Sequence, residues 1–306
     1  MKNFNSWLSG EGAHRQRGSL QRADFKSGNS NIPFAAILLL LFVSLISTST
    51  VLAQTCNCTD YLYVNDPTLD ITHKFIVSPT TGGVVGEVDA PNWLPPGDIL
   101  NAHGVAGDIN GNLYIAQLAE TLPDGSTIPD RLYQVDCDGN ILDNNFITPW
   151  GRTYNLLTIG NLLYTIGQPT GAGLDFRVTA YDVCTKNIVY QEMISPATTV
   201  NWGMSRGEDG NIYVTSSWGG AIAGFTYNHS VYRVSPDLQT ITNVLTVPNS
   251  NADNFTLGVD SDEYGNVYFV VNETGNGNRT TLYKYSSNGI LIHSLVDPGL
   301  NMSGFG

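Results

Sequence analysis

The stretch "GDINGNLYIA" at residues 107–116 carries side-chain oxygens at a spacing that suits a cation. Asp108, Asn110 and Asn112 alternate with other residues, as the ligands of a calcium-binding loop do. Such a loop also needs a bidentate acid at its twelfth position, which here is Ala119. A turn explains the same residues, because Asp and Asn side chains bond their own backbone in turns. We predict a structural turn and no cofactor, with a divalent cation such as calcium as the alternative.

The stretch recurs along the chain, so it belongs to a repeat. Related segments begin at Gly203 ("GMSRGEDGNIYVT") and Gly258 ("GVDSDEYGNVYFV"), and more degenerate copies begin at Asp60 and Leu156. The copies share one tyrosine, at successive steps of 51, 50, 49 and 55 residues: Tyr63, Tyr114, Tyr164, Tyr213 and Tyr268. The ligand positions of the loop vary between copies, which favours the turn.

Each unit predicts four short strands. In one copy these are "GVAGD", "LYIAQL", "RLYQVD" and "ILDNNF", separated by turns rich in Asn, Asp and Gly. A period of about 40 to 50 residues with four strands per unit is typical of a β-propeller. We predict an all-β fold, a β-propeller of four-stranded blades over residues 54–306, with the five modules as blades. A β-sandwich is the second choice, because it would not require one module five times.

The last residues repeat the beginning of a unit. "NMSGFG" places Gly304 and Phe305 where the other copies start their first strand. This predicts a chain that is truncated at its C-terminus, with the modules forming part of a six- or seven-bladed ring. A five-bladed ring closed within the chain is the alternative.

The N-terminus predicts export. Residues 1–31 are basic, and residues 32–53 are uncharged over 22 positions. The apolar core and the small residues before Gln54 are typical of a signal peptide cut after Ala53. An uncleaved signal anchor is the alternative, because 22 uncharged residues can form a transmembrane helix. Either way we expect the remainder to be exported and to be secreted or held at the cell surface.

The exported part is acidic. From Gln54 onward it has 9 basic and 25 acidic residues. Nucleic acid binding needs clustered Lys and Arg, so this surface excludes it as a partner. Anionic lipid is repelled as well, which leaves the N-terminal segment as the only expected contact with a membrane.

Four cysteines lie in this part: Cys56, Cys58, Cys137 and Cys184. An even number in an exported chain favours disulfides. A bond between Cys56 and Cys58 would close a very tight ring, so we expect this pair to be joined to Cys137, Cys184 or both. A zinc site is the weaker alternative, because no His lies beside the C-x-C pair.

The pattern of Gly-hydrophobic followed by (Asp)-x-x-Gly-Asn-hydrophobic-Tyr resembles the NHL and SMP-30/streptogramin-lyase-like group of propellers. The resemblance covers roughly Asp60 to the C-terminus and concerns the fold, since that group holds lactonases, lyases and binding modules. Its lactonases hold a divalent ion with Glu, Asn and Asp at the channel mouth. Here Asn101, Asn201 and Asn254 could supply amides, but no Glu stands at a matching place. The catalytic residues of the lactonases and of the lyases therefore cannot be carried over to this chain.

The first strand of a propeller blade lines the channel, so the residues before each Gly-led strand should gather at one mouth. Those positions hold His103, Trp202, Leu257 and Ser303, with Asn101, Asn201 and Asn254 just upstream. His103 is the candidate for a general base or metal ligand. The plainer interpretation is that His103 packs against the next blade and bonds a backbone carbonyl.

Export, a repeat fold and the lack of a coherent catalytic set favour a binding or scaffold module over an enzyme. We expect a protein or carbohydrate ligand, contacted by His103, Asn101, Trp202, Asn201 and Asn254. The alternative is a metal-dependent lactonase- or lyase-like enzyme with its site at the same mouth.

Overall fold

The chain folds into antiparallel sheets in the computed structural model. The structure describes residues 61–66, 71–78, 80, 84–88, 99, 102–147, 149, 151–168, 176–194, 203–217, 228–248, 255–273 and 279–297. Consecutive strands pair within each sheet, because short turns join them.

The strands form five sheets that follow one another along the chain, named here blades 1 to 5. Blade 1 contains β1 (Tyr61–Asp66), β2 (Ile71–Val77) and β3 (Val84–Val88). Blade 2 contains β4 (Ala102–Gly107), β5 (Leu113–Gln117), β8 (Arg131–Val135) and β9 (Ile141–Ile147), and a small hairpin of β6 (Glu120–Thr121) and β7 (Thr127–Ile128) lies between β5 and β8 in sequence. Blade 3 contains β10 (Arg152–Ile159), β11 (Leu162–Gln168), β12 (Arg177–Asp182) and β13 (Ile188–Met193).

The last two blades repeat this pattern. Blade 4 contains β14 (Met204–Arg206), β15 (Ile212–Ser217), β16 (Asn228–Val234) and β17 (Ile241–Pro248). Blade 5 contains β18 (Phe255–Ser261), β19 (Val267–Glu273), β20 (Arg279–Tyr285) and β21 (Leu291–Asp297).

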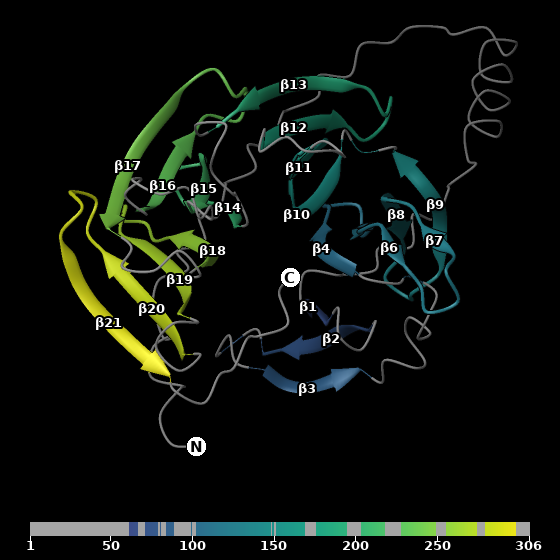
Figure 1. Cartoon of the computed structure of the whole chain (residues 1–306), viewed down its shortest axis with the longest axis horizontal. Helices are drawn as coiled ribbons and strands as arrows, with labels where there is room; N and C mark the ends of the chain where they lie inside the picture. The colour runs from purple at the N-terminus through teal and green to yellow at the C-terminus, as the bar shows by residue number, and fades with distance from the viewer. Residues whose placement is uncertain are drawn as a thin grey trace, which may run out of the picture.

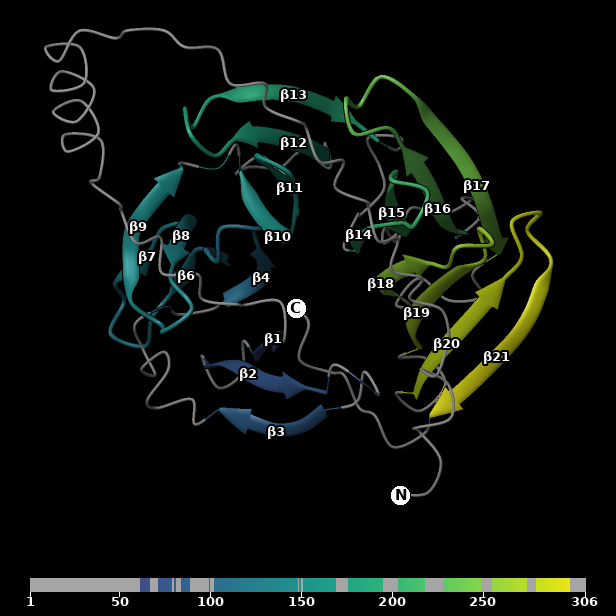
Figure 2. The same ribbon diagram turned by 180° about the vertical axis from the view of Figure 1, so that it is seen from behind.

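The blades stand around a central axis (Figures 1 and 2), with β4, β10, β14 and β18 on the inside and β9, β13, β17 and β21 at the rim. Inner strands of consecutive blades contact one another: β4 meets β10, β10 meets β14, and β14 meets β18. The arrangement is a β-propeller, which confirms the predicted fold class.

Blade 1 differs from the others because it has three described strands. Its first strand, β1, carries Tyr63, whose counterparts Tyr114 and Tyr164 lie in the second strands β5 and β11. Strand β1 is therefore equivalent to a second strand, and no strand in the described part of the chain fills the inner position beside it. The five predicted modules thus correspond to four complete blades and one three-stranded sheet.

The hydrophobic core lies between the blades. All residues of β5 and β15 are buried, because each face of a second strand packs against a neighbouring blade. One cluster joins Tyr114 and Leu132 of blade 2 to Leu163 and Tyr181 of blade 3. Burying a large apolar side chain contributes about 1.5–3 kcal/mol, so these contacts hold the blades together as well as each blade's own strands.

Glycine opens the inner strands because the strands approach closely there. A Cβ atom on Gly104 would lie 3.0 Å from the Cα atom of Asn155 in the next blade. A Cβ atom on Gly203 would lie 3.0 Å from the Cα atom of Gly258. The glycines at the start of the repeat therefore permit the tight packing of inner strands around the axis.

Several predictions of the sequence lie outside the described residues: the basic region 1–31, the export segment 32–53, and the start of a further unit at Gly304. Among the residues that are described, no helix has the length and hydrophobicity that a membrane span requires.

Candidate functional site

A turn built on an aspartate recurs at one end of blades 2 and 5. In blade 2, Oδ1 of Asp108 accepts hydrogen bonds from the backbone N–H groups of Asn110 and Asn112, both at 2.9 Å. Oδ2 accepts from Nδ2 of Asn112 at 2.9 Å and from the hydroxyl of Tyr114 at 3.0 Å. Gly111 takes a positive φ of 84° within this turn, a conformation that glycine adopts without strain.

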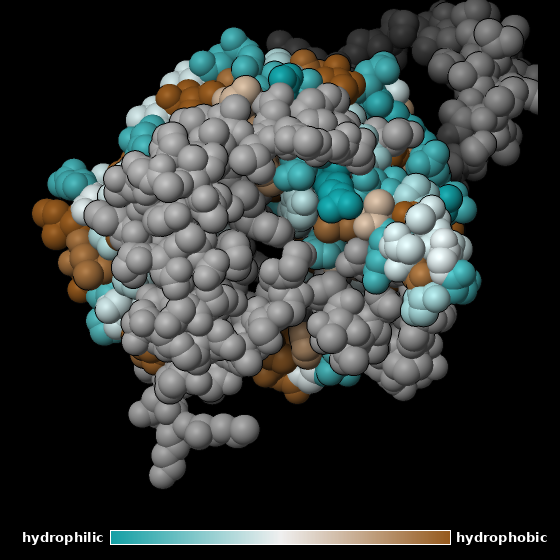
Figure 3. All heavy atoms as spheres, in the orientation of Figure 1, coloured by the Kyte–Doolittle hydropathy of each residue, from teal (hydrophilic) through white to brown (hydrophobic). Residues whose placement is uncertain are grey.

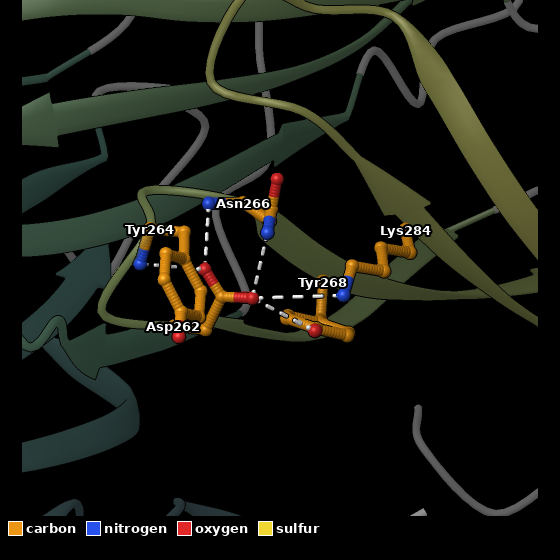
Figure 4. A network of polar contacts seen from close by, with 5 residues as sticks. All are labelled: Asp262, Tyr264, Asn266, Tyr268 and Lys284. Atoms are coloured by element: carbon orange, nitrogen blue, oxygen red, sulfur yellow. Dashed lines mark hydrogen bonds and ion pairs between the residues drawn. The ribbon is translucent and has the colours of Figure 1, made fainter. Parts of the chain in front are cut away.

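Blade 5 builds the same network (Figure 4). Asp262 accepts from Asn266 through backbone and side chain, both at 2.8 Å, and from the Tyr268 hydroxyl at 3.0 Å. Nζ of Lys284 lies 3.6 Å from Oδ2 and adds a positive charge. Burial opposes ionisation, but the hydrogen bonds from Asn266 and Tyr268 and the charge of Lys284 outweigh it and lower the pKa of Asp262.

In blade 4 a carboxylate at a different position plays the same role. Gly207 occupies the place of the aspartate, and a Cβ atom there would lie 2.4 Å from Oγ of Ser261. Asp209, two residues later, accepts from the backbone and side chain of Asn211 at 3.0 and 2.8 Å and from Tyr213 at 3.3 Å. The tyrosine of the repeat is therefore held by a carboxylate in this blade too.

These contacts confirm the structural turn. In Asp108 and in Asp262, each of the two carboxylate oxygens already accepts two hydrogen bonds from its own hairpin. Within the described residues, no group of three or more His, Cys, Asp or Glu side chains gathers in a way that could hold a metal ion. We name this end of the blades the turn end.

The opposite end of the inner strands carries a recurring β-bulge. The register shifts between Ala102 and Val105 in β4, between Thr153 and Asn155 in β10, and between Thr256 and Gly258 in β18. The residues that fall in these bulges are His103, Tyr154 and Leu257. Bulges re-aim side chains and are frequent beside functional sites. We name this end, where the inner strands begin, the mouth end.

His103 and Tyr154 meet across two blades at the mouth end. Their rings stand edge to face, with centroids 6.3 Å apart and planes at 88°. His103 is half-buried, and burial lowers the pKa of its imidazole below 6.5, so the ring is neutral at neutral pH. Tyr154 also packs against the buried ring of Phe176, at a centroid distance of 5.8 Å, which fixes its orientation.

Arg152 joins this pair. It is the first residue of β10, it is exposed, and it stands two residues before Tyr154 in the same strand. Burial raises the pKa of the Tyr154 hydroxyl, and the charge of Asp130 acts in the same direction, while Arg152 opposes the rise. The described part of the mouth end therefore presents an arginine, a protonated tyrosine and a neutral histidine.

A second polar cluster lies near the mouth end of blades 4 and 5. Oγ of Ser217 lies 3.1 Å from Nδ1 of His229 and 2.7 Å from Oγ1 of Thr256, and it accepts from the Thr256 N–H at 3.0 Å. Ser217 and Thr256 are fully buried, so no substrate reaches this serine. The cluster ties β15 and β16 to β18 of the next blade.

Of the predicted site residues, the structure describes the side chain of His103. Asn101, Asn201, Trp202, Asn254 and Ser303 lie outside the described residues, as does the side chain of Leu257. The sequence pattern did not indicate Tyr154 and Arg152 as residues of the mouth end. Tyr154 occupies the bulge of the degenerate copy, in which Asn155 replaces the glycine that marks the position in other blades.

The cysteines divide into two kinds. Cys184 was one of the predicted disulfide candidates, but it is an exposed free thiol in the turn between β12 and β13. No disulfide joins two described residues. Cys137 is buried and in its disulfide-bonded form, so the other half of that bond lies outside the described residues.

A shallow groove lies at the rim between β9 and the turn that joins β12 to β13. It is lined by Phe146, Ile147, Tyr181 and Lys186, among others. Nζ of Lys186 lies 4.7 Å from the centroid of the Phe146 ring and 2.8 Å from Oδ2 of Asp143. The lysine is thus engaged in joining the two blades.

The architecture defines the class of this protein as a β-propeller of four-stranded blades. The sequence pattern of its repeat, with four strands in each complete blade, resembles that of the NHL and SMP-30-like propellers at the level of the fold. No protein-family model matches the chain, and no curated protein matches it either.

Solved structures with a similar fold include enzymes and a calcium-binding protein. A luciferin-regenerating enzyme is 15% identical with a TM-score of 0.48, over 78% of this chain and 72% of that one. A periplasmic gluconolactonase from Pseudomonas aeruginosa is 12% identical with a TM-score of 0.46, over 78% and 69%. Regucalcin from Agrobacterium tumefaciens, described as a calcium-binding protein, is 11% identical with a TM-score of 0.44, over 76% and 72%. These likenesses concern the fold alone.

Proposed function

We propose that the protein is an exported β-propeller that acts as a binding module, secreted or at the cell surface, with its ligand at the mouth end. The observation that carries the proposal is the bulge repeated in β4, β10 and β18, which sets one position in each of these three strands apart from the regular pleat. Export rests on the sequence of residues 32–53.

The chemistry of the mouth end suits a small polar ligand, such as part of a carbohydrate or a peptide. Tyr154 offers an aromatic ring and a hydroxyl, and aromatic side chains with a polar tip are frequent in binding sites. His103 adds one donor and one acceptor as a neutral imidazole. We expect no nucleic acid partner, because the segment from Gln54 onward is acidic.

Saturation-transfer NMR with a panel of free monosaccharides and amino acids tests this proposal. At least one compound should receive saturation from the wild-type protein, and Tyr154→Ala should abolish the transfer. Tyr264→Ala is the matched control, because Tyr264 is 76% exposed in a turn at the opposite end of blade 5. Transfer that persists in Tyr154→Ala, or transfer from no compound at millimolar concentration, would contradict the proposed site.

The second candidate is a metal-dependent lactonase- or lyase-like enzyme at the same mouth. One observation favours it: His103 is neutral at neutral pH, as a general base must be. The turn-end carboxylate of Asp108 accepts four hydrogen bonds from its own hairpin, so it is poorly suited to hold calcium. Hydrolysis of gluconolactone that requires added calcium and is lost in His103→Gln would select this candidate over the binding module.

We also propose that Cys137 pairs with Cys56 or Cys58. Cys184 has a free thiol, so the remaining cysteines of the N-terminal pair are the available partners. Such a bond would fasten the segment that precedes β1 to the turn between β8 and β9. Peptide mapping without reduction should yield a Cys137 peptide linked to one that contains residues 56–58.

A further inference from the structure

Arg152 is an exposed basic residue at the mouth end of an acidic molecule. The segment from Gln54 onward has 9 basic and 25 acidic residues. Lys186, Lys284 and Arg233 each form an ion pair, with Asp143, Asp262 and Asp209 respectively. No ion pair among the described residues includes Arg152, although it is exposed at the mouth end.

The backbone under Arg152 is held firmly. Arg152 pairs with Gln168 in the ladder between β10 and β11. A Cβ atom on Gly167 would lie 2.3 Å from the carbonyl oxygen of Arg152, so the glycine lets the two strands approach at the bulge. The position from which the guanidinium projects is therefore set by the sheet and not by a loop, which favours binding with little ordering cost.

The side chains around Arg152 are mainly donors. The charge of Arg152 acts on the hydroxyl of Tyr154, and His103 stands edge-on to the same tyrosine ring. The carboxylate that acts on Tyr154 belongs to Asp130, and one of its oxygens already accepts the N–H of Ala119 at 2.7 Å. An arginine fork beside a tyrosine hydroxyl matches the two oxygens of a carboxylate.

We infer that the mouth end binds the carboxylate group of a small acidic ligand, with the guanidinium of Arg152 donating to both of its oxygens. This inference rests on the proposed binding function and names its ligand class. The ring of Tyr154, held by Phe176, lies beside the guanidinium and offers an aromatic surface to the body of the ligand. A sugar acid combines these two features, so glucuronate is the chosen probe.

Figure 3 shows hydrophilic side chains near the centre of the ring, on the side of blades 2 and 3. The charge of the whole molecule repels anions, so selective binding of an anion requires a local cation rather than the overall field.

Titration calorimetry on the full chain, at constant ionic strength, compares glucuronate with glucose, which lacks the carboxylate. Glucuronate should bind about tenfold tighter or more, because a charge-assisted bidentate contact is worth at least that factor. Arg152→Gln should weaken glucuronate to the level of glucose, and Arg152→Lys should recover part of the loss. Arg206→Gln is the matched control, because Arg206 is an exposed arginine at the turn end of the inner strand β14.

Three outcomes would overturn the inference. They are equal affinity for glucuronate and glucose, absence of glucuronate binding at concentrations on the order of 10 mM, and equal losses in Arg152→Gln and Arg206→Gln. A neutral ligand whose binding depends on Tyr154 but not on Arg152 would refute the carboxylate and leave the proposed site standing. If no ligand binds in a way that depends on Tyr154, both the carboxylate inference and the proposed binding site are refuted. An unchanged melting temperature of Arg152→Gln shows that the fold is intact.

Discussion

Single residues have different roles at the two ends of a blade. At the turn end, the carboxylates of Asp108 and Asp262 accept hydrogen bonds from their own hairpins. Asp108 thereby fixes Asn112 and the repeat tyrosine of blade 2, and Asp262 fixes Asn266 and the repeat tyrosine of blade 5. At the mouth end, His103 and Tyr154 occupy bulges, so the ladder does not dictate their identity. The first set therefore stabilises the turns, and the second set is where we place the proposed recognition.

Replacing Asp262 by Asn should destabilise the protein by about 1–3 kcal/mol at neutral pH, because a part-buried network loses its charged acceptor. The folded-state pKa of Asp262 lies below 3.8, so its contribution is present above that value and disappears as the pH falls through the folded-state pKa. Urea unfolding at pH 7 and pH 3 should show a smaller difference between wild type and variant at pH 3.

The control for this experiment is Asp138→Asn, which changes an exposed aspartate in the turn that Asp136 organises. This control should unfold like the wild type at both values. An Asp262→Asn difference that is the same at both pH values would show that ionisation of this carboxylate does not contribute.

The imidazole of His103 should titrate with a midpoint below 6.5, since burial is the cause of its lowered pKa. Because the unfolded chain then takes up the proton more readily, the contribution of His103 to stability falls as the pH drops below 6.5. Tyr154→Ala removes part of the covering and should move the midpoint upward. NMR titration of the ring resonances measures both values, and a wild-type midpoint at or above 6.5 would contradict the packing described.

At the scale of strands and turns, the bulge in β10 depends on Gly167. Gly167→Ala should cost about 1–3 kcal/mol, because a methyl group would collide with the Arg152 carbonyl and the strands would have to separate. The same change should weaken ligand binding at the mouth end, since Arg152 and Tyr154 move with the strand.

Gly86→Ala is the matched substitution in β3, where an added Cβ atom meets Cδ1 of Ile76 at an ordinary 3.7 Å. Thermal unfolding should separate the two variants clearly. Similar melting temperatures for both would mean that the bulge adjusts without cost.

The sequence pattern of the repeat was sufficient to predict the strands. Apolar alternation and Asn-Gly turns placed the four strands of blade 2 within a few residues of β4, β5, β8 and β9. It did not predict the small β6–β7 hairpin, whose strands have two residues each and little pattern. Nor did it find Tyr154, because a bulge is a shift in register that leaves no fixed residue type behind in the sequence.

At the scale of the whole molecule, cohesion comes from contacts between neighbouring blades. The core clusters join consecutive blades, and no strand of blade 5 shares an extensive contact with blade 1 among the described elements. Energetic coupling therefore runs along the chain order, as in other repeat proteins.

The thiols offer a test at this scale. Under native conditions without reductant, iodoacetamide should modify Cys184, which is exposed, and should leave Cys137 unmodified. Reduction and unfolding should expose Cys137 to the reagent. Mass spectrometry of the peptides decides the matter, and rapid native labelling of Cys137 would refute its disulfide-bonded state.

The bulge repeated in β4, β10 and β18 also bears on how such a protein can be altered. Because each bulge frees one position per blade while glycines and turn aspartates hold the frame, these positions form a small set that can be randomised together. A combinatorial library at His103, Tyr154 and Leu257 would vary the chemistry of the mouth end while the turns at the other end stay as they are. The propeller would then serve as a display scaffold, with one variable position contributed by each of these three blades.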